Sequence, residues 1–143
     1  MNTATHAHPA PTWIKAAASI GVVWYAFGLF QFWLGFSTDT AAAVDAGKIT
    51  TAHGAAIDAT PLVIWLAFAA ASAAGLIGSA LLFGGSPAAR TLFALSLISA
   101  ALYYIWIYVI SGTGADRPTE EIYVAAMVVA VTLGFNFLSR RMT

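Results

Sequence analysis

Four long apolar stretches that contain no charged residue and no histidine limit what this chain can form. They run over Ala16–Phe36, Leu62–Phe83, Thr91–Ser111 and Ile122–Ser139. Each comes close to the roughly 20 residues that an α-helix needs to cross the hydrocarbon core of a bilayer. The sequence therefore predicts an all-α integral membrane protein built as a four-transmembrane-helix bundle.

Composition points to the same class. Of the 143 residues, 60% are hydrophobic and 8% are charged, whereas about a quarter of the residues of a soluble domain carry charge. The formal net charge of zero gives no basic surface for nucleic acid, and without cysteine there are no disulfides or thiolate metal sites. The lipid bilayer is the expected partner. We expect a flexible tail over residues 1–12 and a single membrane domain over residues 13–143.

The loop charges predict how the chain is oriented. All acidic residues lie between the first and second stretches or between the third and fourth. Four of the six basic residues lie at the other ends of the stretches, at Lys15, Arg90, Arg140 and Arg141. Because Lys and Arg accumulate on the cytoplasmic side of membrane proteins, we expect the N- and C-termini of this multi-pass protein in the cytoplasm.

The connecting segments carry their own signals. The run Gly84-Gly85-Ser86-Pro87 is typical of a tight turn and predicts a hairpin between the second and third spans. The segment Ser37–Thr60 is long for a connector and rich in alanine, so we expect a short surface helix within it. Asp58 and Thr60 precede Pro61 and are candidates to cap the second span.

Small residues recur on one stripe of the first two spans. They are Gly21, Gly28 and Gly35, seven residues apart, and Ala71, Gly75 and Ser79, four residues apart. Small residues at helical spacing let two helix backbones approach closely in lipid. These positions are predicted to pack helices, either within the bundle or between the protomers of a homodimer.

Aromatic side chains gather in the half of the bundle that faces the two acidic loops. The simpler interpretation is an interfacial belt of Trp and Tyr. The alternative is a ligand-binding pocket, because the Gln31 amide lies within a span and must find hydrogen-bond partners. The predicted pocket residues are Gln31, Trp33, Trp65 and Tyr104. Adjacent residues of a helix point about 100° apart, so Tyr103 and Tyr104 are not expected to line the same pocket.

Catalytic and metal sites have little support. His53 shares a loop with Asp45 and Asp58, a set able to bind a metal or act as acid and base, but a solvated loop histidine is the simpler interpretation. Serines within the spans have no histidine or lysine beside them to activate a nucleophile. We therefore assign no catalytic residue, no metal and no cofactor, and we do not expect an enzyme.

Several segments resemble a family of small bacterial membrane proteins with four spans. The resemblance lies in the runs Trp24–Phe32, Thr51–Pro61, Gly75–Phe83 and Leu95–Ile98. The family often has Asn where this chain has Tyr25, and Glu-Gln where it has His53-Gly54. The resemblance implies a four-helix protein of the bacterial inner membrane. Some members are labelled sugar transporters.

The sequence is compatible with three functions. The first is a membrane protein that binds or transports a small polar solute such as a sugar, as a homo-oligomer. The second is a structural or accessory subunit of a larger membrane complex. The third is a membrane enzyme that acts at the outer face and uses His53 with Asp58.

Overall fold

The computed structural model describes residues 10–141, and helices account for every regular element in this range. Four of them are long and apolar enough to cross a membrane. They are α1 (Thr12–Ser37), α4 (Leu62–Phe83), α5 (Ala89–Ile105), which a π-helical turn η1 (Trp106–Ile110) extends, and α6 (Thr119–Arg140). The predicted all-helical, four-span architecture is therefore confirmed. Most of the predicted tail, residues 1–12, lies outside the described residues, and Thr12 already belongs to α1.

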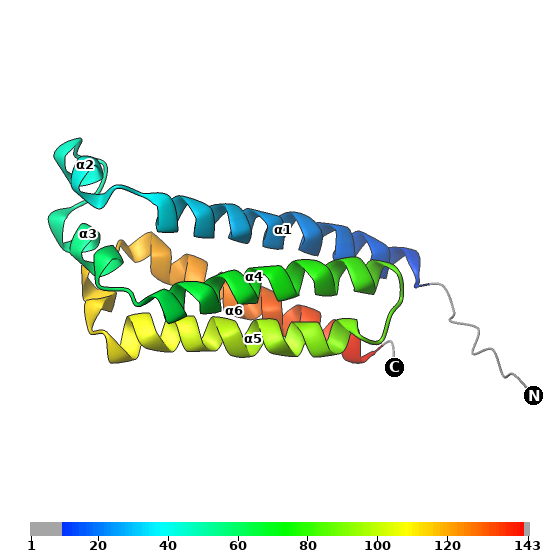
Figure 1. The fold of residues 1–143 in the computed structure, drawn as a ribbon. Coiled ribbons are helices and arrows are strands. Elements are labelled where there is room, and N and C mark those ends of the chain that lie inside the picture. Colours follow the sequence, from blue (N-terminus) through cyan, green and yellow to red (C-terminus); the bar gives the residue numbers. More distant parts are fainter. Residues whose placement is uncertain (1–9, 142–143) are drawn as a thin grey trace, which may run out of the picture.

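The four long helices form a chain of neighbours rather than a closed ring. Helix α4 packs against both α1 and α5, and α6 packs against α5, whereas α1 and α6 share no extended contact. Figure 1 shows the end of α1 and the start of α6 at one end, beside α2 (Thr40–Asp45) and α3 (Thr51–Asp58). We call this end the loop end. The opposite end, where α1 begins and α6 finishes, is the terminal end. Which end faces the cytoplasm stays a prediction.

The surface of the four helices is strongly apolar. Val109 and Tyr123 are each 72% exposed and Val23 is 71% exposed, and many other large apolar side chains are at least half exposed. Water contact with so much apolar area would cost about 25 cal/mol for each Å². Lipid is therefore the medium that suits this surface, in a multi-pass membrane protein.

The hairpin between α4 and α5 follows from its glycines. Gly85 adopts a left-handed φ of 74°, and the Ser86 N–H donates to the Leu81 carbonyl over 2.9 Å while the Gly85 N–H donates to Leu82 over 3.0 Å. This is the Schellman pattern, which satisfies the last carbonyls of a helix. The predicted tight turn is confirmed here.

The predicted small-residue stripes of the first two spans face each other. A Cβ added at Gly28 would lie 2.7 Å from the Ser72 hydroxyl oxygen, and one added at Gly35 would lie 2.9 Å from the Trp65 ring. A Cβ at Gly75 would collide with the Tyr25 ring. Gly21 meets both Ser79 and Phe135, and Ala71 accepts a hydrogen bond from Ser96 of α5. The side chains that fill these gaps all belong to the same chain.

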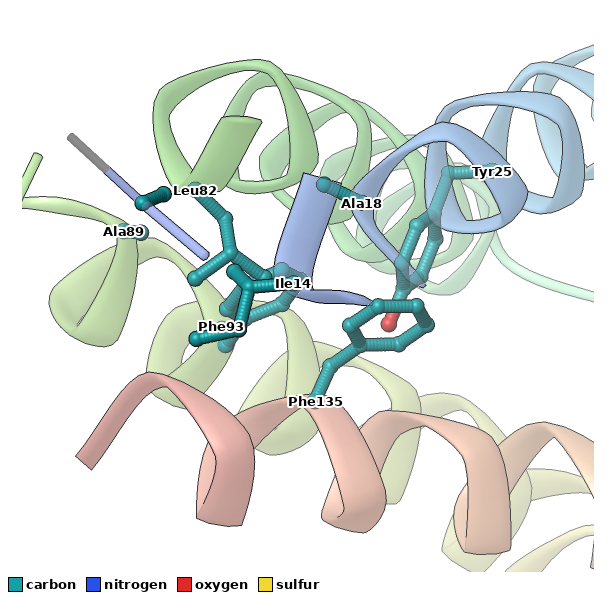
Figure 2. Close-up of a cluster of buried hydrophobic side chains, with 8 residues drawn as sticks. Ile14, Ala18, Tyr25, Leu82, Ala89, Phe93 and Phe135 are labelled. Carbon is teal, nitrogen blue, oxygen red and sulfur yellow. The ribbon is translucent and has the colours of Figure 1, made fainter. Parts of the chain in front are cut away.

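A cluster of buried side chains closes the bundle toward the terminal end. Figure 2 shows Ile14, Tyr25, Leu82, Phe93 and Phe135 converging from all four long helices. The rings of Phe93 and Phe135 stack with centroids 5.2 Å apart, and Tyr25 lies 6.3 Å from Phe93. Apolar packing is therefore dense in this half of the molecule.

The loop between α1 and α4 forms two short helices rather than the single one predicted. Asp39 caps α2 by accepting from the Ala42 N–H, and Thr50 caps α3 by accepting from the His53 N–H. The expectation that Asp58 and Thr60 cap α4 is wrong. Pro61 occupies the cap position of α4 without a side-chain bond, Thr60 donates back to the Ala56 carbonyl, and Asp58 accepts from the Thr40 hydroxyl.

Candidate binding cavity

A cavity of about 530 Å³ lies in the loop half of the bundle. Side chains from all four long helices line it, together with Ile49, His53 and Ile57 of the loop that contains α3. Its volume falls in the range of roughly 300–1,000 Å³ that small-molecule sites occupy. Natural protein interiors otherwise leave few voids larger than a water molecule, so a space of this size is a candidate binding site.

The floor of the cavity is a short chain of hydrogen bonds. The Tyr25 hydroxyl of α1 donates to the Thr132 hydroxyl of α6 over 3.2 Å, and Thr132 donates to the Val128 carbonyl over 2.8 Å. Ser96 of α5 donates to the Ala71 carbonyl of α4 over 2.7 Å. Because the absent side chain of Gly75 makes room for the Tyr25 ring, the phenol can cross from α1 to α6 at this level.

Aromatic rings form the wall on the side of α4 and α5. Trp65 and Phe68 come from α4, and Phe68 stacks on Tyr103 of α5 with centroids 4.8 Å apart. Tyr104 meets Tyr103 edge to face at 5.2 Å and also lines the cavity. The expectation that these adjacent tyrosines cannot share one pocket is therefore wrong. The cavity is wide enough to reach two faces of α5.

Helix α5 ends in a π-helical turn beside this wall. The Ser111 N–H donates to the Trp106 carbonyl, five residues back, over 2.8 Å. A π-turn takes in one more residue than an α-turn and often occurs at functional sites. Ile107 and Tyr108, both within it, line the cavity. Gly112 then turns the chain away with a left-handed φ of 68°.

Three ionisable side chains lie at the loop end of the cavity. The Arg117 Nη1 donates to Glu121 Oε2 over 3.0 Å, and the His53 Nε2 lies 3.5 Å from Glu121 Oε1. Glu121 stands in the first turn of α6, where a carboxylate is favoured by the positive end of the helix dipole. This triad joins the α3 loop to α6 and forms the polar end of an otherwise largely apolar cavity.

Arg117 is the most buried charge of the triad. Its side chain is only 8% exposed, and its Nε has no hydrogen-bond partner among the described residues. Leaving a buried donor unpaired costs about 1–3 kcal/mol, and more for a charged group. A buried unpaired group of this kind needs an explanation, such as an ordered water, an ion or a functional role.

The cavity opens sideways between α1 and α6. Toward the terminal end the two helices are bridged by the Tyr25–Thr132 hydrogen bond and by Phe135 against Gly21. Toward the loop end they separate, and the lining residues Phe27 and Val124 are 54% and 49% exposed. In a membrane this opening would face acyl chains rather than water.

Comparison of the chain with family models, with curated proteins and with solved structures finds no match. The resemblance to the bacterial four-span family therefore stays a prediction.

Three of the four predicted pocket residues lie around this cavity, namely Gln31, Trp65 and Tyr104. Trp33 does not, because it stands two residues after Gln31, about 200° around the helix. Its side chain is 63% exposed on the outer surface of α1. Trp33 is therefore removed from the candidate site.

The proposed pairing of His53 with Asp58 is contradicted by their partners. Asp58 accepts from Thr40 over 2.8 Å, whereas the acidic neighbour of His53 is Glu121 of α6. Within residues 10–141 no group of three or more His, Asp or Glu side chains is placed to hold a metal ion. The acid–base arrangement that motivated an enzyme at the outer face is thus not formed by these residues.

Arg117 and Glu121 are cavity residues that the search for polar groups within the spans does not find. The sequence nevertheless contains a signal for them. Arg117 is the one basic residue in the second acidic loop, which the loop charges predict to face outward, where the positive-inside rule disfavours a basic residue. Glu121 follows four residues later, which is the spacing of an ion pair on a helix surface. A basic residue on the disfavoured side, spaced to pair with an acid, indicates a local role.

Proposed function

We propose that this protein binds a small molecule in the loop-half cavity of its bundle, as a step in carrying that molecule across or within a bacterial inner membrane. The observation that carries the proposal is the cavity of about 530 Å³, with aromatic walls and polar groups at both ends. An apolar pocket with a few convergent polar groups is the usual form of a small-molecule site.

Small residues keep this space open. Ala71, Ser72 and Ala100 all line the cavity. Larger side chains at these positions would fill it, as Phe93 and Phe135 fill the terminal half. The contrast between a packed half and a hollow half within one bundle supports a binding role for the hollow half.

A polar solute such as a sugar is one candidate ligand, as the family resemblance implies. Gln31 supplies an amide with two donors and two acceptor sites on the side of α1. The rings of Trp65 and Tyr104 offer flat surfaces for the apolar face of a sugar ring. Both termini in the cytoplasm, as we propose from the loop charges, would place the cavity toward the outer face.

An accessory role in a larger complex receives no separate support. The glycines that suggested seams for assembly are filled by Ser72, Trp65 and Tyr25 of the same chain. These seams therefore serve the bundle itself. A homodimer stays a prediction, which the mass of the protein in a detergent or nanodisc preparation would test.

Binding of radiolabelled solutes to the purified protein in nanodiscs tests the proposal, followed by uptake into proteoliposomes. We expect saturable binding that Gln31→Leu weakens and that Ala100→Phe, which fills the cavity, abolishes. Ala70→Phe is the matched control, because Ala70 is an exposed alanine of α4 that does not line the cavity. Equal binding by Ala100→Phe and Ala70→Phe, or no saturable binding of any solute, would refute the proposal.

A further inference from the structure

The Arg117 Nε–H, which has no hydrogen-bond partner among the described residues, indicates which chemical group a ligand presents at this end of the cavity. Arg117 lines the cavity, its side chain is only 8% exposed, and its Nε lacks a partner within the described part of the chain. Guanidinium donates hydrogen bonds and never accepts them. A ligand that meets this group therefore presents an acceptor, such as an oxygen atom.

The charge of Arg117 is already balanced. Glu121 contacts the guanidinium through Oε2 at 3.0 Å and lies beside His53 through Oε1. A second anion placed against Arg117 would lie close to the Glu121 carboxylate in a poorly hydrated site, where like charges repel strongly. An uncharged acceptor, such as a carbonyl or hydroxyl oxygen, satisfies the Nε donor without that repulsion.

The shape of the cavity indicates the route of entry. The α3 loop lies over the loop end, where Ile49 and Ile57 line the cavity together with His53. The opening between α1 and α6 is bordered by apolar side chains, among them the half-exposed Phe27 and Val124. A molecule dissolved in the bilayer reaches such an opening directly, whereas a strongly hydrated solute would have to cross acyl chains first.

We infer that the ligand is an uncharged, lipid-soluble molecule that enters between α1 and α6 and offers an oxygen acceptor to Arg117. Its apolar body lies among the rings of Phe68, Tyr103 and Tyr104. This inference rests on the proposed function and deepens it, since it replaces a water-soluble solute by a membrane-soluble one at the same site.

Three probes of matched shape test the inference, namely 2-acetonaphthone, 2-ethylnaphthalene and 2-naphthoate. They share one ring system and carry a neutral acceptor, no acceptor and an anion. Equilibrium dialysis against the protein in nanodiscs, with empty nanodiscs subtracted, measures specific binding. We expect the ketone to bind about tenfold tighter than the hydrocarbon, because a hydrogen bond to a charged donor contributes that much. The naphthoate should bind more weakly than the ketone.

Arg117→Lys provides the matched variant. It keeps a cation beside Glu121 but removes the Nε donor, so the tenfold preference for the ketone should fall to about twofold or less. Arg90→Lys, an exposed arginine at the α4–α5 turn, should leave the preference unchanged. The measure is a ratio between two probes on one variant, so a general loss of folded protein would not mimic the effect.

Failure of the inference can be told from failure of the proposed function. Equal binding of ketone and hydrocarbon, tighter binding of the naphthoate, or an unchanged preference in Arg117→Lys would each overturn the inference. Saturable binding of glucose without binding of any naphthalene probe would also overturn it, while the binding function would stand. Absence of binding by glucose and by all three probes would refute both the inference and the proposed function.

Discussion

The hydroxyl of Tyr25 lies 3.2 Å from the hydroxyl of Thr132, 107 residues away in sequence, and joins the first long helix to the last. Toward the terminal end the bundle is packed, and toward the loop end the two helices part around a cavity. This single hydrogen bond thus lies at the boundary between the two halves of the molecule.

Removing that bond should loosen the contact between α1 and α6. Tyr25→Phe deletes the donor while the ring still fills the space beside Gly75 and Thr132 keeps its bond to Val128. We expect the free energy of unfolding to fall by about 0.5–1 kcal/mol, the usual value of one such bond. Denaturation in mixed micelles measures it, with Tyr123→Phe as an exposed control. A double-mutant cycle with Thr132→Ala that gives no coupling would contradict the contact.

Substitution by alanine should have different effects on stability at two glycines within the spans. A Cβ at Gly75 would collide with the Tyr25 ring, whereas a Cβ at Gly134 of α6 would meet no atom within 4 Å. Gly75→Ala should therefore destabilise the protein by about 1–3 kcal/mol, as overpacked cores do. Gly134→Ala should be neutral or stabilising by up to about 1 kcal/mol, because glycine is a poor helix former. The same unfolding assay compares the two, and equal effects would disprove the α1–α4 seam.

The two neighbouring glutamates at the start of α6 should contribute differently to the stability of the protein. Glu121→Gln leaves the guanidinium of Arg117 buried without its counter-charge, which we expect to cost about 1–2 kcal/mol of stability. Glu120→Gln changes an exposed carboxylate and should cost less than about 0.5 kcal/mol. Thermal unfolding of both variants at low salt gives the comparison. If Glu120→Gln proved the more harmful change, the triad would not be formed as described.

Trp33 and Trp65 should differ in their contact with lipid. Trp33 is 63% exposed on the apolar surface, whereas Trp65 is 9% exposed. In variants that retain a single tryptophan, with the other four replaced by Phe, brominated phospholipid should quench Trp33 strongly and Trp65 little. Fluorescence in bilayers with and without bromine is the measurement. Equal quenching would show that the lipid boundary lies elsewhere.

The orientation of the chain can be read with single cysteines, since the natural sequence has none. Asp45→Cys at the loop end should react with a membrane-impermeant maleimide on intact bacterial cells. Ala88→Cys at the α4–α5 turn should react only after the membrane is permeabilised. Both residues are exposed, so access differs only by side of the membrane. The reverse pattern would invert the predicted topology.

Most of the fold could be predicted from the sequence because lipid imposes a minimum length on every span. The stretch Leu62–Phe83 coincides with α4, and the other three spans differ from their helices by a few residues at each end. The first and last residues of each helix cannot be predicted from the apolar pattern alone. Helix α1 begins at Thr12, before Lys15, since one basic residue near a membrane surface does not end a helix.

The candidate site could be predicted only in part, because it depends on contacts between distant segments. The sequence predicts three of its residues, because a polar side chain and aromatic rings fall in the same half of the bundle. These residues are Gln31, Trp65 and Tyr104. The partner of His53 could not be predicted, since Glu121 is 68 residues further along the chain and meets His53 only because the fold brings α3 to the start of α6. Asp58 likewise bonds to Thr40, 18 residues earlier, rather than to the adjacent helix end.

The π-turn over Trp106–Ile110 makes this end of α5 tolerant of a change in chain length. A wide turn holds one residue more than an ordinary one, so deletion of a single residue there would leave a regular α-helix of nearly the same reach. Side chains beyond the deletion would keep nearly the same faces, because the lost residue is the one that the wide turn had absorbed. Only the part of the cavity wall that Ile107 and Tyr108 form would change, so one lost codon would reshape the binding space while the bundle survives.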